Sequence, residues 1–182
     1  MAAMNIQVID WRIKPLEQIV VGIDAAIAAV RERMDSEGID GLEGRDLAEF
    51  MLGLGFVAFQ NYAIKTWTDL NIIRDGFGKP PVDKLACYRC DQFTVKQNGP
   101  TRIELINAAA NYFKHHDEWS QREWSQWPDN ETTRTLSRVG ITQQSEFPCI
   151  EAVRIFCGDS WKLMVLHQIV REWREHVLKP QR

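Results

Sequence analysis

One stretch of the sequence decides the fold: Thr101-Arg-Ile-Glu-Leu-Ile-Asn-Ala-Ala-Ala-Asn-Tyr-Phe-Lys-His-His-Asp-Glu-Trp119. In a helix, where successive side chains turn by about 100°, several of its polar side chains fall within an arc of about 80°. These residues, which we call the polar seam, are Glu104, Asn107, Asn111, His115 and Glu118. Apolar side chains cover most of the remaining circumference. Because buried polar groups are costly without partners, the seam must face water, a second polar surface or a ligand.

The start of this helix is marked by turn and capping residues. Asn98-Gly-Pro100 breaks the preceding chain. Thr101 followed by Glu104 matches a capping box, in which a hydroxyl and a carboxylate satisfy backbone amides that lack helical partners.

Helical periodicity extends to both sides of the seam helix. Apolar residues at spacings of three and four predict helices over 15–34, 45–70 and 148–178, with a break or kink at 158–160. The expected core comprises 19–30, 47–64, 103–113 and 150–177. In the second helix, the expected buried face consists of Leu47, Phe50, Met51, Leu54, Val57, Ala58 and Ile64. Gly53 and Gly55 within it predict close packing against a neighbouring helix.

The remaining segments read as connections. Residues 1–14 are expected to be irregular, 82–95 to contain a short helix, and 128–147 to be extended or short-helical. Four to five long helices joined by Gly- and Pro-rich loops predict an all-α bundle. The chain of 182 residues is therefore interpreted as a single all-α domain spanning 1–182.

Composition narrows the classes of function. A net charge of −3 argues against a nonspecific nucleic-acid binder, which normally needs a surplus of Lys and Arg. The chain shows neither a secretory signal pattern nor a run of about 18 apolar residues, so we expect a cytoplasmic protein that does not enter a membrane. The four cysteines are then expected to be reduced.

The end of the seam helix, Ala110-Asn-Tyr-Phe-Lys-His115, resembles the active-site segment of HEPN domains. This all-α family includes many bacterial toxin and phage-defence ribonucleases. In its motif an Arg, often followed by Asn, precedes a His by four to six residues. Here Asn111 and His115 match, and Ala110 stands in place of the Arg. The resemblance implies a HEPN-like bundle, and a homodimer in which two motif helices face each other.

The resemblance also suggests roles for particular residues. His115 would act as general acid or base beside Asn111, with Glu118 holding its tautomer. Lys114 would substitute for the missing positive charge, although an ammonium lacks the bidentate fork of a guanidinium. His116 is the alternative histidine. Glu104, Asn107 and His116 would form the binding seam.

Several other patterns have competing interpretations. Residues 115–118 (His-His-Asp-Glu) are competent metal ligands, but adjacent side chains diverge on a helix, so no metal site is predicted. Cys87 and Cys90 have CxxC spacing without a matching second half, which favours reduced thiols over zinc.

Trp119, Trp124 and Trp127 are interpreted as packing residues, with base stacking as the alternative. Arg171 and His176 match the Arg–His spacing formally, but composition predicts about one such match by chance.

Three hypotheses about function follow. The first is a HEPN-like protein of a bacterial defence or toxin–antitoxin system that binds a nucleotide, RNA or protein partner without catalysis. The second is an active, metal-independent ribonuclease toxin using Asn111 and His115. The third is a helical interaction protein unrelated to HEPN. None of them calls for a cofactor.

Overall fold

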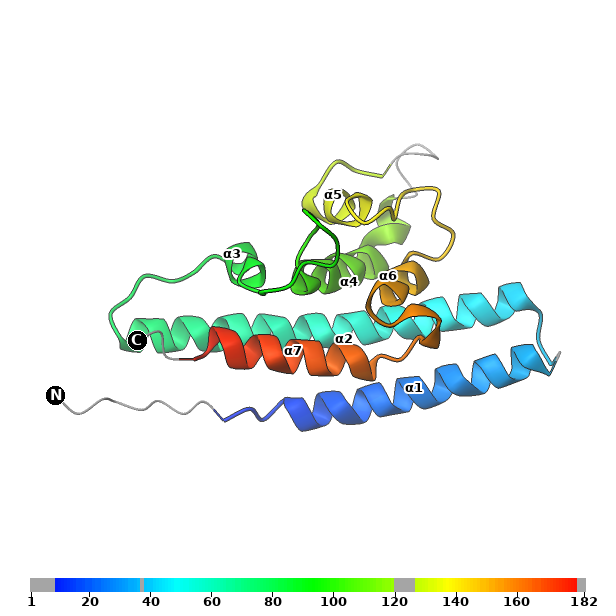
Figure 1. The fold of residues 1–182 in the computed structure, drawn as a ribbon, viewed down its shortest axis with the longest axis horizontal. Coiled ribbons are helices and arrows are strands. Elements are labelled where there is room, and N and C mark those ends of the chain that lie inside the picture. The colour runs from blue at the N-terminus through cyan, green and yellow to red at the C-terminus, as the bar shows by residue number, and fades with distance from the viewer. Residues whose placement is uncertain (1–8, 37, 120–126, 180–182) are drawn as a thin grey trace.

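The computed structural model describes residues 9–36, 38–119 and 127–179, and confirms an all-α fold (Figure 1). Its helices are α1 (Ile13–Asp35), α2 (Gly41–Gly76), α3 (Lys84–Arg89), α4 (Arg102–Trp119), α5 (Glu131–Ser137), α6 (Pro148–Cys157) and α7 (Met164–Val177), with a 3₁₀ turn η1 (Gly158–Ser160) between the last two. In these described ranges the only β pairing is an isolated bridge between Thr94 and Thr101.

The long helix α2 is central to the arrangement. It forms a hairpin with α1 and also contacts α3, α4, α6 and α7 (Figure 1). α5 packs on α4. The seam helix α4 is therefore enclosed by α2 and α6 as well as by the short helices α3 and α5.

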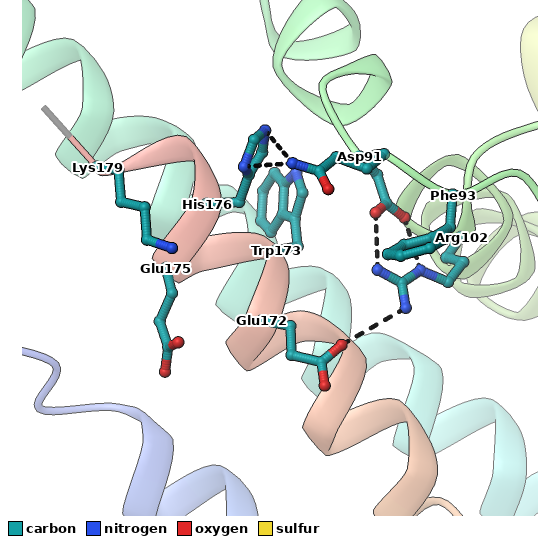
Figure 2. A pocket seen from close by; sticks show the side chains of 9 residues that line it. Asp91, Phe93, Arg102, Glu172, Trp173, Glu175, His176 and Lys179 are labelled. Atoms are coloured by element: carbon teal, nitrogen blue, oxygen red, sulfur yellow. Dashed lines mark hydrogen bonds and ion pairs between the residues drawn. The ribbon is translucent and has the colours of Figure 1, made fainter. Parts of the chain in front are cut away.

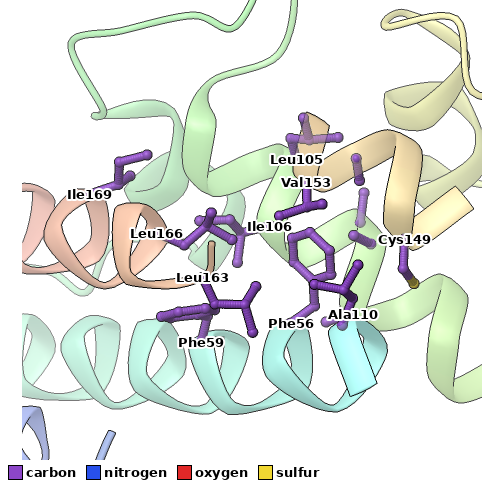
Figure 3. Packing of buried hydrophobic residues seen from close by; sticks show 14 of the residues in the cluster. Phe56, Phe59, Leu105, Ile106, Ala110, Cys149, Val153, Leu163, Leu166 and Ile169 are labelled. Carbon is purple, nitrogen blue, oxygen red and sulfur yellow. The ribbon is translucent and has the colours of Figure 1, made fainter. Parts of the chain in front are cut away.

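The core lies where α2, α4, α6 and α7 meet (Figure 3). Phe56 and Phe59 come from α2, and neither is exposed to solvent. They belong to one apolar cluster with Ile106 of α4, Val153 of α6 and Leu166 of α7. Burial of each such side chain contributes about 1.5–3 kcal/mol, so this cluster is the main source of stability.

The buried face of α2 differs from the predicted one. Leu47, Phe50, Leu54 and Ile64 are exposed, and Ile19 of α1 is exposed as well. The residues of α2 that are buried instead include Ala48, Leu52, Phe56, Phe59, Tyr62 and Ala63. Met51, Val57 and Ala58 are half-buried against the core, so the prediction was wrong for the four exposed residues of α2, which carries apolar side chains on more than one face. Periodicity could not identify the face that neighbours would cover.

Two glycines of α2 allow neighbouring parts of the fold to approach this helix closely. A Cβ atom on Gly53 would lie 1.9 Å from Cδ2 of Phe113 in α4, and one on Gly55 would lie 2.3 Å from Cδ1 of Leu163. Both neighbours occupy space that any side chain would fill. The predicted close packing at these glycines is confirmed.

Aspartate side chains precede two helices that start earlier than predicted. Asp40 accepts hydrogen bonds from the amides of Leu42 and Glu43 at 2.8 and 2.9 Å, so α2 begins at Gly41 in place of residue 45, and it extends to Gly76 in place of residue 70. α1 has Arg12 as its N-cap residue without a side-chain capping bond, and Asp10 before it accepts from the amides of Arg12 and Ile13 at 3.1 and 3.2 Å. The last two residues of the segment expected to be irregular, 13 and 14, are therefore helical.

The C-terminal region is divided at the predicted break. Residues 158–160 form η1, and φ is +60° at Gly158 and +54° at Trp161. A carboxylate from another helix caps each half. Glu49 of α2 accepts from the amides of Cys149 and Ile150 at 2.7 and 2.9 Å. Asp24 of α1 accepts from Leu163 and Met164 at 2.7 and 3.2 Å, so both helix starts are tied to the hairpin.

The segment expected to contain a short helix, 82–95, and the segment expected to be extended or short-helical, 128–147, each contain one helix. α3 lies within 82–95, and α5 lies within 128–147. Asn130 caps α5 by accepting from the amide of Thr133 at 3.1 Å, and Asp83 caps α3.

α2 is also the one helix in the described part of the chain whose length and composition would allow it to cross a bilayer. Half of its most apolar 18-residue window is buried inside the fold. Core helices of soluble proteins meet the same criterion, so this feature is weak support for a membrane span.

Candidate functional site: a polar cavity on α4

The first turn of α4 buries the N-terminal residue of the polar seam. Thr101 Oγ1 accepts from the amide of Glu104 at 3.1 Å, and Glu104 Oε2 accepts from the amide of Thr101 at 2.8 Å, which confirms the predicted capping box. Glu104 Oε1 also pairs with Nε of Arg89 at 2.8 Å. The Glu104 side chain is only 6% exposed, so these partners offset the cost of burying its charge.

The next two seam residues share a partner on α2. Gln60 is buried, and its Nε2 donates to Oδ1 of Asn107 at 2.9 Å and to Oδ1 of Asn111 at 2.8 Å. Asn111 Nδ2 lies 3.4 Å from Oγ1 of Thr132 in α5. The two asparagine side chains are therefore held in place from both sides of α4.

A cavity of about 210 Å³ opens beside these asparagines, between α3, α4 and α5. We call it the α4 cavity. Its lining consists of Lys84, Leu85, Glu104, Asn107, Ala108, Asn111, Glu131, Thr132 and Thr135. Three seam residues therefore share one polar cavity with residues from the two short helices.

The remaining predicted site residues lie outside this lining. His115 Nδ1 is 3.2 Å from Oε1 of Glu118, so the two form a partly exposed pair at the end of α4. Lys114 is exposed. Partial desolvation of its ammonium, together with the charge of Lys84, lowers the Lys114 pKa.

His116 belongs to a cluster of aromatic rings. It stacks on Tyr112 with ring centroids 5.0 Å apart. Trp119 and Trp127 lie 5.9 and 5.6 Å from the same tyrosine, and 6.0 Å from each other. These contacts favour the packing interpretation of both tryptophans. Trp124 lies outside the described residues.

Metal ligands do not gather in the described ranges. No group of three or more His, Cys, Asp or Glu side chains there has the arrangement of a metal site. Cys87 and Cys90 are both free thiols, the first buried and the second exposed. Burial raises the pKa of Cys87 to about 12, so its thiol stays protonated near neutrality.

A second cavity, of about 220 Å³, lies between α7 and the segment that follows α3 (Figure 2). Here Arg102 pairs with Asp91 through two hydrogen bonds of 3.0 and 2.8 Å, and Gln92 Nε2 lies 2.8 Å from Nδ1 of His176. Arg171, the other half of the formal Arg–His match, is not part of this lining and pairs weakly with Glu175 at 3.9 Å. The two residues of that match thus lie in different surroundings.

Sequence reasoning missed Gln60, Lys84, Thr132 and Thr135. Gln60 carried one weak signal, because it and Asn61 are polar residues directly after the apolar stretch from Phe50 to Phe59. The other three lie on short helices whose position against α4 depends on tertiary packing.

Comparison of the chain with protein families, with curated proteins and with solved structures gives no match.

Proposed function

We propose that this chain is a HEPN-like bacterial protein of a defence or toxin–antitoxin system that binds a nucleotide or RNA in the α4 cavity without cleaving it. One observation carries the proposal: Gln60 holds Asn107 and Asn111 rigidly at the wall of a cavity. Pre-organised carboxamides are suited to hydrogen bonding with a base edge or a phosphate. The proposal includes a cytoplasmic homodimer.

The size of the cavity supports a small ligand group. At about 210 Å³ it is below the range of about 300–1,000 Å³ that is usual for drug-sized ligands. One nucleotide moiety suits this space better than a long strand.

Binding is favoured over cleavage by the position of Ala110. This residue stands where the HEPN motif has its Arg, and it is fully buried in the apolar core. A guanidinium at this position would face Phe56 and its neighbours and not the cavity that Asn111 lines. His115 is also absent from the lining. The HEPN motif uses an Arg and a His for cleavage, and neither has a counterpart in the lining of the α4 cavity.

The proposal is tested by calorimetric titration of the protein with 5′-AMP, with 5′-UMP and with a short single-stranded RNA, combined with an RNA cleavage assay. We expect saturable binding and intact RNA. Asn111→Leu should abolish binding, and Gln92→Leu, in the second cavity, should leave it unchanged. Light scattering of the same sample measures the oligomeric state, which we expect to be a dimer.

Other outcomes support the remaining hypotheses. RNA cleavage that disappears in His115→Ala would establish the ribonuclease toxin. Absence of binding to all three probes would refute the proposal and leave a helical interaction protein unrelated to HEPN.

A further inference from the structure

The orientation of the Gln60 carboxamide follows from its neighbours. Its terminal Nε2 atom lies 3.4 Å from the backbone oxygen of Asn107, as well as 2.9 Å from Oδ1 of the same residue. A backbone carbonyl can only accept a hydrogen bond. The atom of Gln60 that faces it must therefore be the NH2 group and not the amide oxygen.

This orientation determines which side-chain atoms of Asn107 and Asn111 face away from Gln60. Since Gln60 donates to both Oδ1 atoms, each asparagine turns its Nδ2 group away from Gln60. Asn111 Nδ2 reaches only a long 3.4 Å contact with Thr132. The Asn107 side chain, in a residue that is 9% exposed, has Gln60 as its one hydrogen-bonding partner among the described residues, and that bond uses Oδ1, so its Nδ2 has none.

A second buried donor lines the same space. Thr135 is 4% exposed, and its hydroxyl has no hydrogen-bond partner within the part of the chain that the structure describes. Neither this hydroxyl nor Asn107 Nδ2 is among the fully enclosed polar atoms without partners in the described residues, so both are accessible from the cavity. Asn107 and Thr135 thus both offer hydrogen atoms to an occupant of the cavity.

The charges around the cavity complement this donor surface. Its two carboxylates already have cationic partners: Glu104 pairs with Arg89, and Glu131 pairs with Arg89 at 3.1 Å and with Arg134 at 4.0 Å. Lys84, which also lines the cavity, forms no ion pair with any described residue, and neither does Lys114. Glu104, Glu131 and Asp129 share the two arginines, so Lys84 is the cation of the lining that remains available to an anion.

We infer that Gln60 sets the hydrogen-bonding polarity of the α4 cavity, and that the cavity takes the oxyanion group of a ligand, a phosphate or a carboxylate. Asn107, Asn111 and Thr135 would donate to its oxygens, and Lys84 would balance its charge. Gln60 is a positioning residue in this arrangement, because it acts through the two asparagines. The inference rests on the proposed function, in that it assigns the same cavity as the binding site.

The test begins with the wild-type protein and uses calorimetric titration with inorganic phosphate, acetate, 5′-AMP, adenosine and methylammonium. We expect binding of phosphate or acetate, 5′-AMP to bind more tightly than adenosine, and no binding of methylammonium. Comparison of phosphate with acetate identifies which oxyanion is preferred.

The variant Gln60→Met then removes the amide donor without adding charge. It should weaken oxyanion binding by about tenfold or more, as expected when hydrogen bonds to a charged group lose their geometry. Gln92→Met makes the same change in the second cavity and should bind as the wild type does. Unfolding in urea establishes that each variant is folded.

Three results would overturn the inference. If adenosine binds as tightly as 5′-AMP, the proposed nucleotide site survives but its oxyanion selectivity is refuted. If methylammonium binds in place of phosphate, the assigned polarity is reversed. If folded Gln60→Met binds phosphate as the wild type does, Gln60 does not position the donors. The comparisons made with the wild-type protein test the inference even if Gln60→Met fails to fold. If none of the probes binds, the proposed function itself is refuted.

Discussion

Gln60 and Asn111 are 51 residues apart in the sequence and are joined by a hydrogen bond of 2.8 Å between Nε2 and Oδ1. The bond connects the core face of α2 to the cavity face of α4. Breaking such a bond leaves a buried polar group without a partner, which costs about 1–3 kcal/mol. Stability of the fold and organisation of the cavity therefore depend on the same contact.

The two unpaired lysines should strengthen anion binding in an additive and salt-sensitive way. Lys84→Gln and Lys114→Gln should each weaken binding of inorganic phosphate by about twofold to fivefold, as expected for ion pairs near the surface. The double variant should also show a weaker dependence of affinity on salt concentration. Titration at two salt concentrations measures both effects, and Lys162→Gln, two residues before α7, serves as a control. Unchanged affinity in the double variant would place the bound anion elsewhere.

Gly53 should tolerate no side chain. Gly53→Ala places a Cβ atom 1.9 Å from the ring of Phe113, and we expect a loss of about 1–3 kcal/mol in the free energy of unfolding. Gly22→Ala in α1 is the matched control, because nothing lies within 4 Å of its Cβ position. The control should stabilise the protein by about 0.5–1 kcal/mol through helix propensity. Urea denaturation measures both values, and equal effects would contradict the observed packing.

Arg174 should be among the most sensitive charged residues. It is 5% exposed and contacts Asp69 at 2.9 Å and Asp10 at 3.1 Å. Arg174→Leu removes one partner from each carboxylate, whereas Asp69 keeps Lys65 and Asp10 keeps the Tyr62 hydroxyl, so we expect a loss of about 3 kcal/mol. Arg154→Leu, which disrupts an exposed pair with Asp159, should change stability by about 1 kcal/mol or less. Thermal or urea unfolding distinguishes these outcomes, and a mild effect at Arg174 would contradict its structural role.

Glu49 should make stability depend on pH. Burial raises its pKa above the ordinary 4.5, although the amides of Cys149 and Ile150 act in the opposite direction. A carboxyl whose pKa is higher in the folded state stabilises the fold most below the unfolded-state pKa, and this contribution is lost as pH rises through the folded-state pKa. The free energy of unfolding of the wild type, relative to Glu49→Gln, should therefore fall as pH rises from 4.5 toward neutrality.

Urea unfolding of both proteins over this pH range provides the measurement. Subtracting the values for Glu49→Gln removes contributions from other titrating groups that the two proteins share. A difference that grows with rising pH would mean that the capping hydrogen bonds outweigh desolvation.

Local patterns predicted much of the helical structure. The Thr101–Glu104 capping box, the break at 158–160 and the packing role of Gly53 all involve short-range signals or strong steric requirements, and the structure confirms each of them. The predicted polar seam also contained three residues that line the α4 cavity, Glu104, Asn107 and Asn111. These features depend on residues close together in the sequence, so periodicity and capping rules could find them.

The sequence-based predictions were wrong about which face of α2 is buried, and they missed contacts between residues that are far apart in the sequence. Phe50 fits an apolar stripe on α2 but is 59% exposed, whereas Phe56 on another side of the helix is fully buried. Periodicity alone cannot choose between two apolar faces. That choice depended on where small residues such as Gly53 and Gly55 allow neighbouring helices to approach.

The sequence by itself determined an all-α chain with a capped helix carrying a polar arc, because helix propensity, capping and side-chain period are local properties. Only the tertiary structure decided that this arc divides into a buried cavity at Asn107 and Asn111 and an exposed pair at His115 and Glu118. The physical reason is that α2, α3 and α5 cover the first part of α4, and that Gln60 reaches it from a distant segment of the chain.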